Sequence, residues 1–258
     1  MSNIILATPD LSDAATITGS LALGDMSLQN LKEVNLFKKY RTENLSPQIN
    51  IDFGSAKAIN FAALVAHNAT DSATVTIKAG ATSAVSDFTS GALDMITGSD
   101  NGADRKSFSH FFASQTYRYW RFEISDTGNP DAFLEAGRMY LSNAFQPATN
   151  AIYGMEEGFS DESRVARTVS GGVSTVVRDP FQVAAFELDF TSKQEMFAAA
   201  FDIDKNRGKA KDVIFIPDIE DATYFQKRFL YGKFNEMNPI IHASFNIFRK
   251  RYRIEEIK

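Results

Sequence analysis

Short segments in which polar and apolar residues alternate recur along this sequence, and they constrain its fold more than any other feature. In residues 48–53 and again in residues 73–78, every second residue is apolar. Successive side chains of a β-strand point to opposite faces, so each segment predicts a strand with one buried face. Residues 59–67 are almost all apolar, which indicates a strand that is buried on both faces.

Turn-forming residues separate these segments. Gly54 and Ser55 are expected to end the first strand, and the polar residues 68–72 form a turn before the third. Further β segments follow at residues 111–125 and 134–141. Regular strands with turns between them predict a β-sandwich in the N-terminal half rather than alternating strands and helices.

The C-terminal half mixes strands with one helix. Residues 181–190 alternate, and a change of parity at Ala185 and Phe186 predicts a bulge. Residues 191–201 predict a helix, because Ser192 and Glu195 have the spacing of a capping box. Three further strands are expected, and these are residues 212–217, 224–234 and 241–254. This half is therefore predicted to be an α+β domain, either a β-sandwich or a split barrel with one helix.

Composition excludes several classes of function. The 258 residues carry a net charge of −5, which does not favour specific binding to nucleic acid. The chain has no cysteine, so disulfides, thiolate catalysis and cysteine-ligated zinc are excluded. Neither a signal peptide nor a membrane span is expected. We expect the protein to be made in the cytoplasm and kept there, or packaged into a particle assembled there.

The sequence offers little that could support catalysis. Its three histidines, His67, His110 and His242, lie far from one another, and no spacing typical of a metal site or a cofactor motif is present. Residues 100–104 are acidic but lack the pattern of a calcium loop. We therefore predict no enzymatic activity, no cofactor and no metal. A hydrolase built on scattered carboxylates remains the third alternative.

Aromatic side chains suggest another kind of site. Phe88 and Phe108 are candidate glycan contacts, because aromatic faces pack well on sugar rings. Trp120 and Phe122 lie on one face of an alternating segment, and core packing is the favoured interpretation for both. Carbohydrate binding is therefore the second functional hypothesis.

The N-terminal half resembles a known family. Residues 48–54, the apolar segment 58–68 and residues 119–124 resemble three strands of discoidin (galactose-binding-like) domains. This resemblance covers most of residues 45–142. It implies a β-sandwich of the jelly-roll type, and members of this family often bind sugars.

The linker and the C-terminal half resemble a second family. Residues 134–172 contain short runs that resemble distal tail proteins at the tail tip, or baseplate, of long-tailed phages. The last 115 residues or so are similar to the ring-forming part of those proteins, up to residues 254–256. The resemblance implies a structural virion protein of the tail tip, whose oligomeric ring connects the tail tube to the baseplate hub.

The predicted organisation has two domains. Residues 1–144 form a discoidin-like β-sandwich, and residues 145–258 form a tail-ring assembly domain with a flexible arm at 153–180. Within the arm, residues 165–177 are expected to form a hairpin that turns at Gly171 and Gly172. The expected partners are copies of the chain in a hexamer or trimer, and the tail tube, tape-measure and hub proteins. A host surface glycan is the expected partner under the alternative hypothesis. Candidate subunit-interface residues are Tyr153, Phe159, Arg164, Arg167, Arg249, Arg251 and Tyr252.

Overall fold

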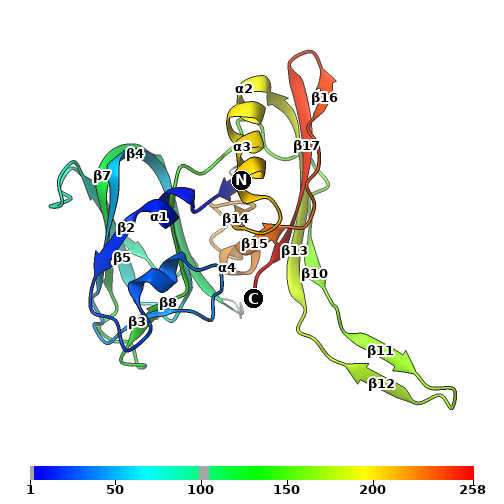
Figure 1. The fold of residues 1–258 in the computed structure, drawn as a ribbon, viewed down its shortest axis with the longest axis horizontal. Helices are drawn as coiled ribbons and strands as arrows, with labels where there is room; N and C mark the ends of the chain where they lie inside the picture. Colours follow the sequence, from blue (N-terminus) through cyan, green and yellow to red (C-terminus); the bar gives the residue numbers. More distant parts are fainter. Residues whose placement is uncertain (1–2, 99–104) are drawn as a thin grey trace.

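The computed structural model describes residues 3–98 and 105–258. The chain is mainly β, with curled sheets, and this confirms the predicted fold class. Figure 1 shows a β-sandwich beside a second body that carries a tall sheet, a helix and a long projecting hairpin.

The elements have the following bounds along the chain. The first part contains β1 (Ile5–Ala7), α1 (Asp10–Ala14), β2 (Thr16–Gly19), η1 (Leu28–Lys32), β3 (Tyr40–Thr42), β4 (Gln48–His67), β5 (Thr74–Gly80), β6 (Phe88–Asp94), β7 (Lys106–Ser125), β8 (Leu134–Ala136) and β9 (Arg138–Ser142). The second part contains β10 (Glu156–Ser160), β11 (Arg164–Arg167), β12 (Val173–Val176), β13 (Phe181–Ser192), α2 (Lys193–Glu195), η2 (Met196–Ala200), α3 (Phe201–Arg207), β14 (Asp212–Ile216), α4 (Phe225–Arg228), β15 (Leu230–Phe234), β16 (Ile241–Ser244) and β17 (Ile247–Glu256).

Two long antiparallel strands organise the sandwich. β4 and β7 each have 20 residues and pair with each other along most of their length. The beginning of β4 also pairs with β2, and its end pairs with β9. β5 and β6 extend the sheet beyond β7, while β3 and β8 form a separate pair.

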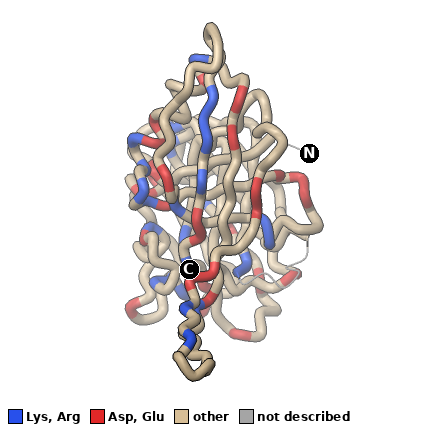
Figure 2. The backbone as a smooth tube through the Cα atoms, turned by 90° about the vertical axis from the view of Figure 1, so that its right-hand side faces the viewer, with Lys and Arg blue, Asp and Glu red and all other residues tan. Residues whose placement is uncertain are grey.

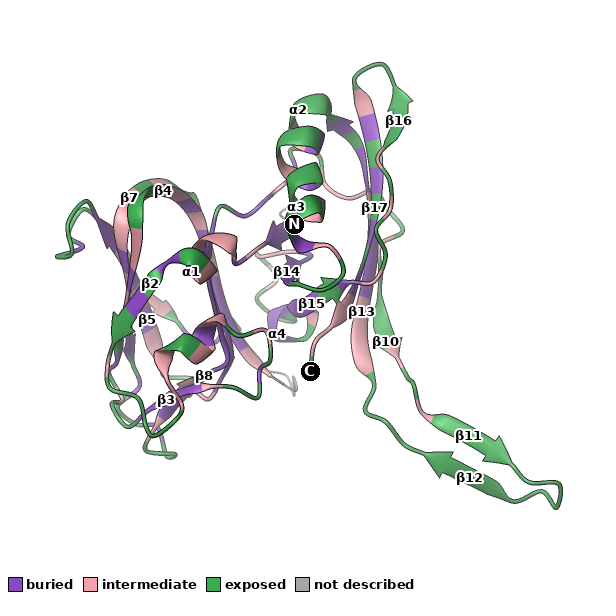
Figure 3. Cartoon of the chain, in the orientation of Figure 1, coloured by how far each residue is buried: buried purple, intermediate pink, exposed green. Residues whose placement is uncertain are grey.

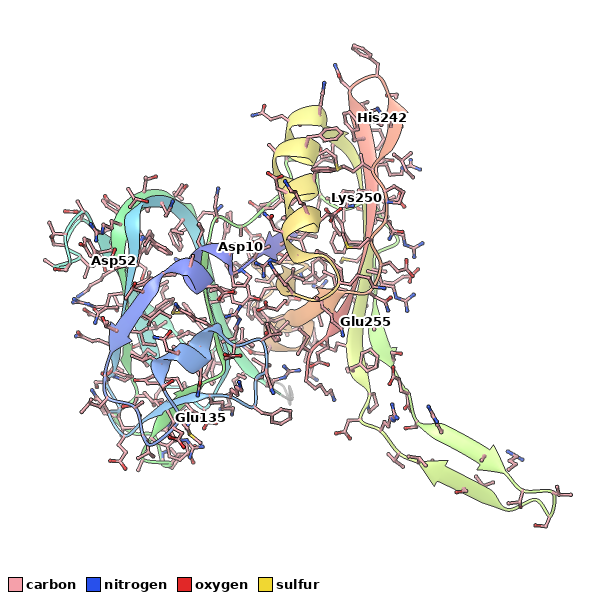
Figure 4. The ribbon with its side chains drawn as sticks, in the orientation of Figure 1. Asp10, Asp52, Glu135, His242, Lys250 and Glu255 are labelled. Carbon is pink, nitrogen blue, oxygen red and sulfur yellow. The ribbon has the colours of Figure 1, made fainter. Side chains whose placement is uncertain are left out.

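The first strand does not end at Gly54, and that prediction was wrong. β4 continues from residue 48 to residue 67 through an irregularity between Asp52 and Lys57. Gly54 has a φ of +72° there, and its N–H donates to Asp52 Oδ1 over 2.7 Å. Arg118 donates to both oxygens of Asp52, which Figure 4 labels, and lowers the pKa of that carboxyl to about 2. The glycine therefore bends the strand without ending it.

The second body is built on a seven-stranded sheet. Its strand order is β1-β14-β15-β17-β13-β10, and β16 also pairs with β17. β1 comes from the N-terminal end of the chain, and Ile5 pairs with Ile216 of β14. Assigning all of residues 1–144 to the sandwich was therefore incorrect, because β1 belongs to the C-terminal sheet.

The predicted capping box is present at the start of the helix. The Glu195 N–H donates to Ser192 Oγ over 3.2 Å, and the Ser192 N–H donates to the Glu195 carboxylate. The helix continues past the predicted end through η2, a π-helical stretch, to Arg207. It covers one face of the tall sheet (Figure 1).

Three local predictions for the C-terminal half were wrong. Residues 224–234 are not one strand, because α4 precedes β15. Residues 241–254 are not one strand either, because β16 and β17 form a hairpin that turns at Phe245 and Asn246. The irregularity of β13 lies between Leu188 and Thr191 rather than at Ala185.

Strands that are buried on both faces join the two bodies. Val213 and Phe215 of β14 pack into the core of the C-terminal sheet, whereas Ile214 and Ile216 pack into a third cluster at the junction. β4 alternates in the same way, because Leu64 lies in the sandwich core, whereas Ala63 and Val65 on either side of it in the sequence lie in the junction cluster. The continuous apolar runs in the sequence are therefore explained by strands that separate two cores.

A buried arginine links the same two bodies. Arg138 of β9 donates from Nε to Asp212 of β14 over 2.7 Å, and its two Nη atoms donate to Asp13 over 2.6 and 2.8 Å. The Tyr140 hydroxyl donates to Asp212 over 2.7 Å. Burial favours a higher pKa for Asp212, but the bonds and charge of Arg138 outweigh it and hold that pKa below its ordinary value.

Candidate functional site

The most distinctive surface feature is a two-stranded arm formed by β11 and β12. The predicted arm at 153–180 was too long, because residues 156–160 form β10 of the C-terminal sheet. Arg164 pairs with Val176 at its base, and Arg167 pairs with Val173 near its tip. The turn holds Gly171 at a φ of +84°, and the predicted hairpin is confirmed. Figure 1 shows the arm projecting from the lower end of the tall sheet, well away from the rest of the chain.

The arm is held mainly by its own hydrogen bonds. The Arg178 N–H donates to Ser163 Oγ over 2.8 Å at the base, and the Arg178 guanidinium donates to Glu162 over 3.1 Å. At the tip, the Gly172 N–H donates to Thr168 Oγ1 over 3.0 Å. All eight strand residues of the arm are exposed, as Figure 3 shows in green.

Apolar side chains are exposed along the whole arm. They are Val165, Val169, Val173, Val176 and Val177. A two-stranded hairpin without a packed face is only marginally stable in water. Exposed apolar side chains that are grouped in this way mark a protein interaction surface.

The predicted interface residues fall into two groups. Tyr153, Phe159, Arg164, Arg167 and Arg251 are exposed, and Arg249 also lies on the exposed face of β17. Their role at an interface stays a prediction. Tyr252 is only 1% exposed and stacks on Phe186 in the core, with ring centroids 5.3 Å apart, so its assignment to the interface was wrong.

The exposed face of β17 carries three arginines, Arg249, Arg251 and Arg253, and acidic residues lie on the neighbouring strands. Arg249 donates to Asp189 and lies 2.9 Å from Glu187, both on the neighbouring strand β13. Arg251 lies 3.8 Å from Glu156 of β10. Figure 2 shows basic and acidic positions distributed over the same side of the molecule. Carboxylates on β13 and β10 therefore partly balance the positive charge of this face, through the ion pairs of Arg249 and Arg251.

The upper end of the C-terminal body has exposed aromatic residues that the sequence did not predict as a surface. Phe245 is 92% exposed at the turn between β16 and β17. Phe190 is exposed with a φ of +58°, a strained conformation for this residue type. Phe197 and Phe201 of the helix are partly exposed, with ring centroids 6.0 Å apart, and Phe197 also packs edge-on against the buried Phe248 of β17. Phe197 and Phe201 have helical spacing in the sequence, which indicated an apolar stripe packed on the core instead.

An aromatic cluster lies at the surface of the sandwich. Phe88 stacks on Phe112 with ring centroids 5.5 Å apart, and Phe112 stacks on His110 at 5.6 Å. These three side chains are half-buried, and Phe88 and Phe112 also contact the buried Trp120. Phe108 is only 1% exposed, so its assignment as a glycan contact was incorrect, because no sugar ring can reach its face.

The three histidines lie apart from one another and differ in burial. Burial lowers the pKa of His67 to about 3 and also lowers the pKa of His110. His242 packs edge-on against Phe248. The acidic segment at residues 100–104 lies outside the described residues. Among the described residues, no group of three potential metal-ligating side chains is found.

Two hollows lie on the surface. A cleft of about 430 Å³ beside β10 contains Arg105, Glu157, Arg228 and Glu256, and each of these side chains has an ion-pair partner. A groove of about 480 Å³ runs between the helix and the segment that connects the two bodies. In the part of the chain that the structure describes, no helix is long and apolar enough to cross a membrane.

Comparison with known proteins finds similarity in structure only. No protein-family model and no curated protein matches the sequence. The CBM32 of AlyQ in complex with 4,5-unsaturated mannuronic acid is 21% identical, with a TM-score of 0.37, and the match covers 50% of this chain and 94% of that one. The lectin domain of lectinolysin complexed with Lewis B antigen is 15% identical, with a TM-score of 0.40 and coverage of 55% and 99%. CpGH89CBM32-4 from Clostridium perfringens, in complex with glcNAc-alpha-1,4-galactose, is 11% identical, with a TM-score of 0.38 and coverage of 51% and 91%.

Proposed function

We propose that this chain is a non-catalytic structural subunit that assembles with other copies of itself through its projecting arm. The observation that carries the proposal is the arm itself, a hairpin whose strand residues are all exposed and whose side chains include five valines. Burying one valine completely contributes about 1.5–3 kcal/mol. A partner surface would therefore stabilise both the arm and the assembly.

The position of the arm favours a head-to-tail contact. The arm leaves the lower end of the C-terminal sheet, whereas the turn of β16 and β17 lies at its upper end (Figure 1). A contact between two different patches repeats from copy to copy and gives a ring when the rotation closes. The edge strand β10 pairs only with β13, so its other side also offers backbone groups to a neighbour.

More specifically, the proposed assembly is a ring at the tail tip of a long-tailed phage, where the protein is part of the virion. It is supported by the resemblance of the linker and C-terminal half to distal tail proteins, and by an exposed arm that offers one side of a head-to-tail contact. In this proposal the ring joins the tail tube to the baseplate hub, and the sandwich projects from it.

Removal of the arm tests the proposal. Ser160 and Phe181 are direct partners across β10 and β13, so a short Gly-Ser turn can replace residues 161–179 without disturbing the sheet. We expect the intact protein to be oligomeric and the shortened protein to be a folded monomer. Light scattering coupled to size-exclusion chromatography measures both masses.

The control for removal of the arm is a substitution at another exposed apolar side chain. Leu21→Ser removes an exposed apolar side chain from the sandwich and is expected to leave the oligomer intact. An intact protein that stays monomeric at every concentration tested would contradict the proposal.

Glycan binding by the sandwich is the second candidate function, and the surface cluster of Phe88, Phe112 and His110 favours it. Half-buried aromatic rings held by a core are suited to stack on a sugar. We expect Phe88→Ala to weaken binding to any glycan detected on an array by about tenfold, which corresponds to about 1.4 kcal/mol.

The matched control for this test is Phe37→Ala, which removes an exposed ring far from the cluster in sequence. Titration calorimetry with the glycan from the array gives the affinities. Equal affinities of the Phe88 variant and the intact protein would exclude the cluster as the sugar site.

A further inference from the structure

The groove beside the helix has acidic walls on both sides. Asp10 of α1 lies on one wall, and Glu195 and Asp202 of the helix lie on the other. Figure 4 shows Asp10 at the junction between the sandwich and the C-terminal body. None of the residues that line this groove is a lysine or an arginine. The groove is therefore suited to a basic occupant.

The three carboxylates differ in how far they are already engaged. Asp10 accepts a hydrogen bond from the buried Arg207. Glu195 accepts hydrogen bonds from the Ala148 N–H and from Ser192. Asp202 is exposed and has no ion pair within the described part of the chain. It is thus the carboxylate that is free to receive a cation.

The floor of the groove has room for small apolar groups. Ala198 and Ala199 lie between the acidic positions of the helix, and their short side chains leave space above the backbone. The volume of about 480 Å³ falls within the range of pockets that hold a small molecule. A groove of this volume can hold a few side chains from the tip of a hairpin, but it is too small for both strands of the hairpin.

The arm tip has the complementary chemistry. Arg167 is exposed and has no acidic partner among the described residues, whereas Arg178 at the base is paired with Glu162. Val169 follows within the turn and is fully exposed. The hydrogen bonds between Thr168 and Gly172 hold the turn in one shape, which lowers the entropy cost of docking.

The groove cannot be filled by the arm of the same chain. In Figure 1 the arm points down and away from the sheet, while the helix lies against the opposite side of the sheet and near its upper end. A second copy of the chain is the occupant that carries both the basic residue and the apolar tip.

We infer that the arm tip of one subunit docks in this groove of the next, with Arg167 paired to Asp202 and Val169 packed over the alanines of the helix. This inference rests on the proposed self-assembly and specifies its contact surface. A salt bridge at the edge of a partly closed groove is stronger than one on an open surface, because less water screens it.

A charge exchange tests the inference. We expect Asp202→Arg and Arg167→Glu each to raise the dissociation constant of self-association by about tenfold. The double variant carries the same pair in reverse and is expected to recover most of that loss. Sedimentation equilibrium of the full-length chain gives the dissociation constants, and circular dichroism confirms that each variant is folded.

The control is Glu236→Arg, which changes an exposed carboxylate outside the groove in the same way and is expected to have no effect. Suppose that the Asp202 variant associates normally while removal of the arm abolishes association. This result would exclude the groove as the docking site, and the proposed self-assembly through the arm would still hold. Unchanged association on arm removal would overturn both.

Discussion

Arg138→Met is expected to lower the free energy of unfolding by about 3 kcal/mol, because it removes one of the two arginines that face a buried carboxylate. The other arginine, Arg207, stays 3.5 Å from Asp212 and places the loss at the lower end of the range for a broken buried ion pair. Asp212 is 1% exposed and accepts a hydrogen bond from Arg138 over 2.7 Å. Asp13 loses two hydrogen bonds in the same variant. Urea denaturation followed by circular dichroism gives the change in free energy.

An exposed ion pair provides the control for Arg138. Lys38 lies 3.7 Å from Glu33, and both side chains are more than half exposed. Lys38→Met removes a charge in the same manner and is expected to change the free energy of unfolding by no more than about 1 kcal/mol. Similar losses in the two variants would show that burial of the Arg138 network contributes nothing.

Trp120→Ala is expected to cost about 3–5 kcal/mol, the range found when a large aromatic side chain is removed from a core. Trp120 is 1% exposed and contacts both Phe88 and Phe112, with ring centroids 6.0 and 5.9 Å away. It is the only tryptophan in the chain, so the variant must be followed by circular dichroism instead of fluorescence.

The comparison for Trp120 is again Phe37→Ala. Phe37 is 85% exposed, and its removal is expected to change stability by no more than about 0.5 kcal/mol. A loss below about 1 kcal/mol for Trp120→Ala would show that the sandwich core tolerates a cavity at its centre.

Local patterns predicted much of the fold correctly. The apolar runs 59–67 and 212–217 lie in strands that are buried on both faces, because these strands separate two cores. The spacing of Ser192 and Glu195 predicted the helix start, and the paired glycines predicted the arm turn. The helix start and the arm turn are both determined by residues that lie within a few positions of the sequence pattern that predicted them.

The predictions that were wrong concern residues whose strand boundaries or burial depend on contacts with distant parts of the chain. The turn at Phe245 and Asn246 contains no glycine or proline, so its residues did not separate β16 from β17. Phe108 and Tyr252 are aromatic residues on alternating strands, and only the packing of other elements shows that both are buried. The acidic groove joins residues near positions 10 and 200, which no local pattern could connect.

The pairing of β1 with β14 has a consequence for the order of folding. β1 is synthesised before the sandwich, and β14 after it, yet Ile5 and Ile216 are direct partners. Ile4, Ile5 and Leu6 are fully buried in the finished protein. On the ribosome, Phe145 can pair with Leu6 on one side of this segment as soon as it emerges, but the side that faces β14 waits for its partner until most of the chain is made. In that interval the segment is a natural target for a chaperone.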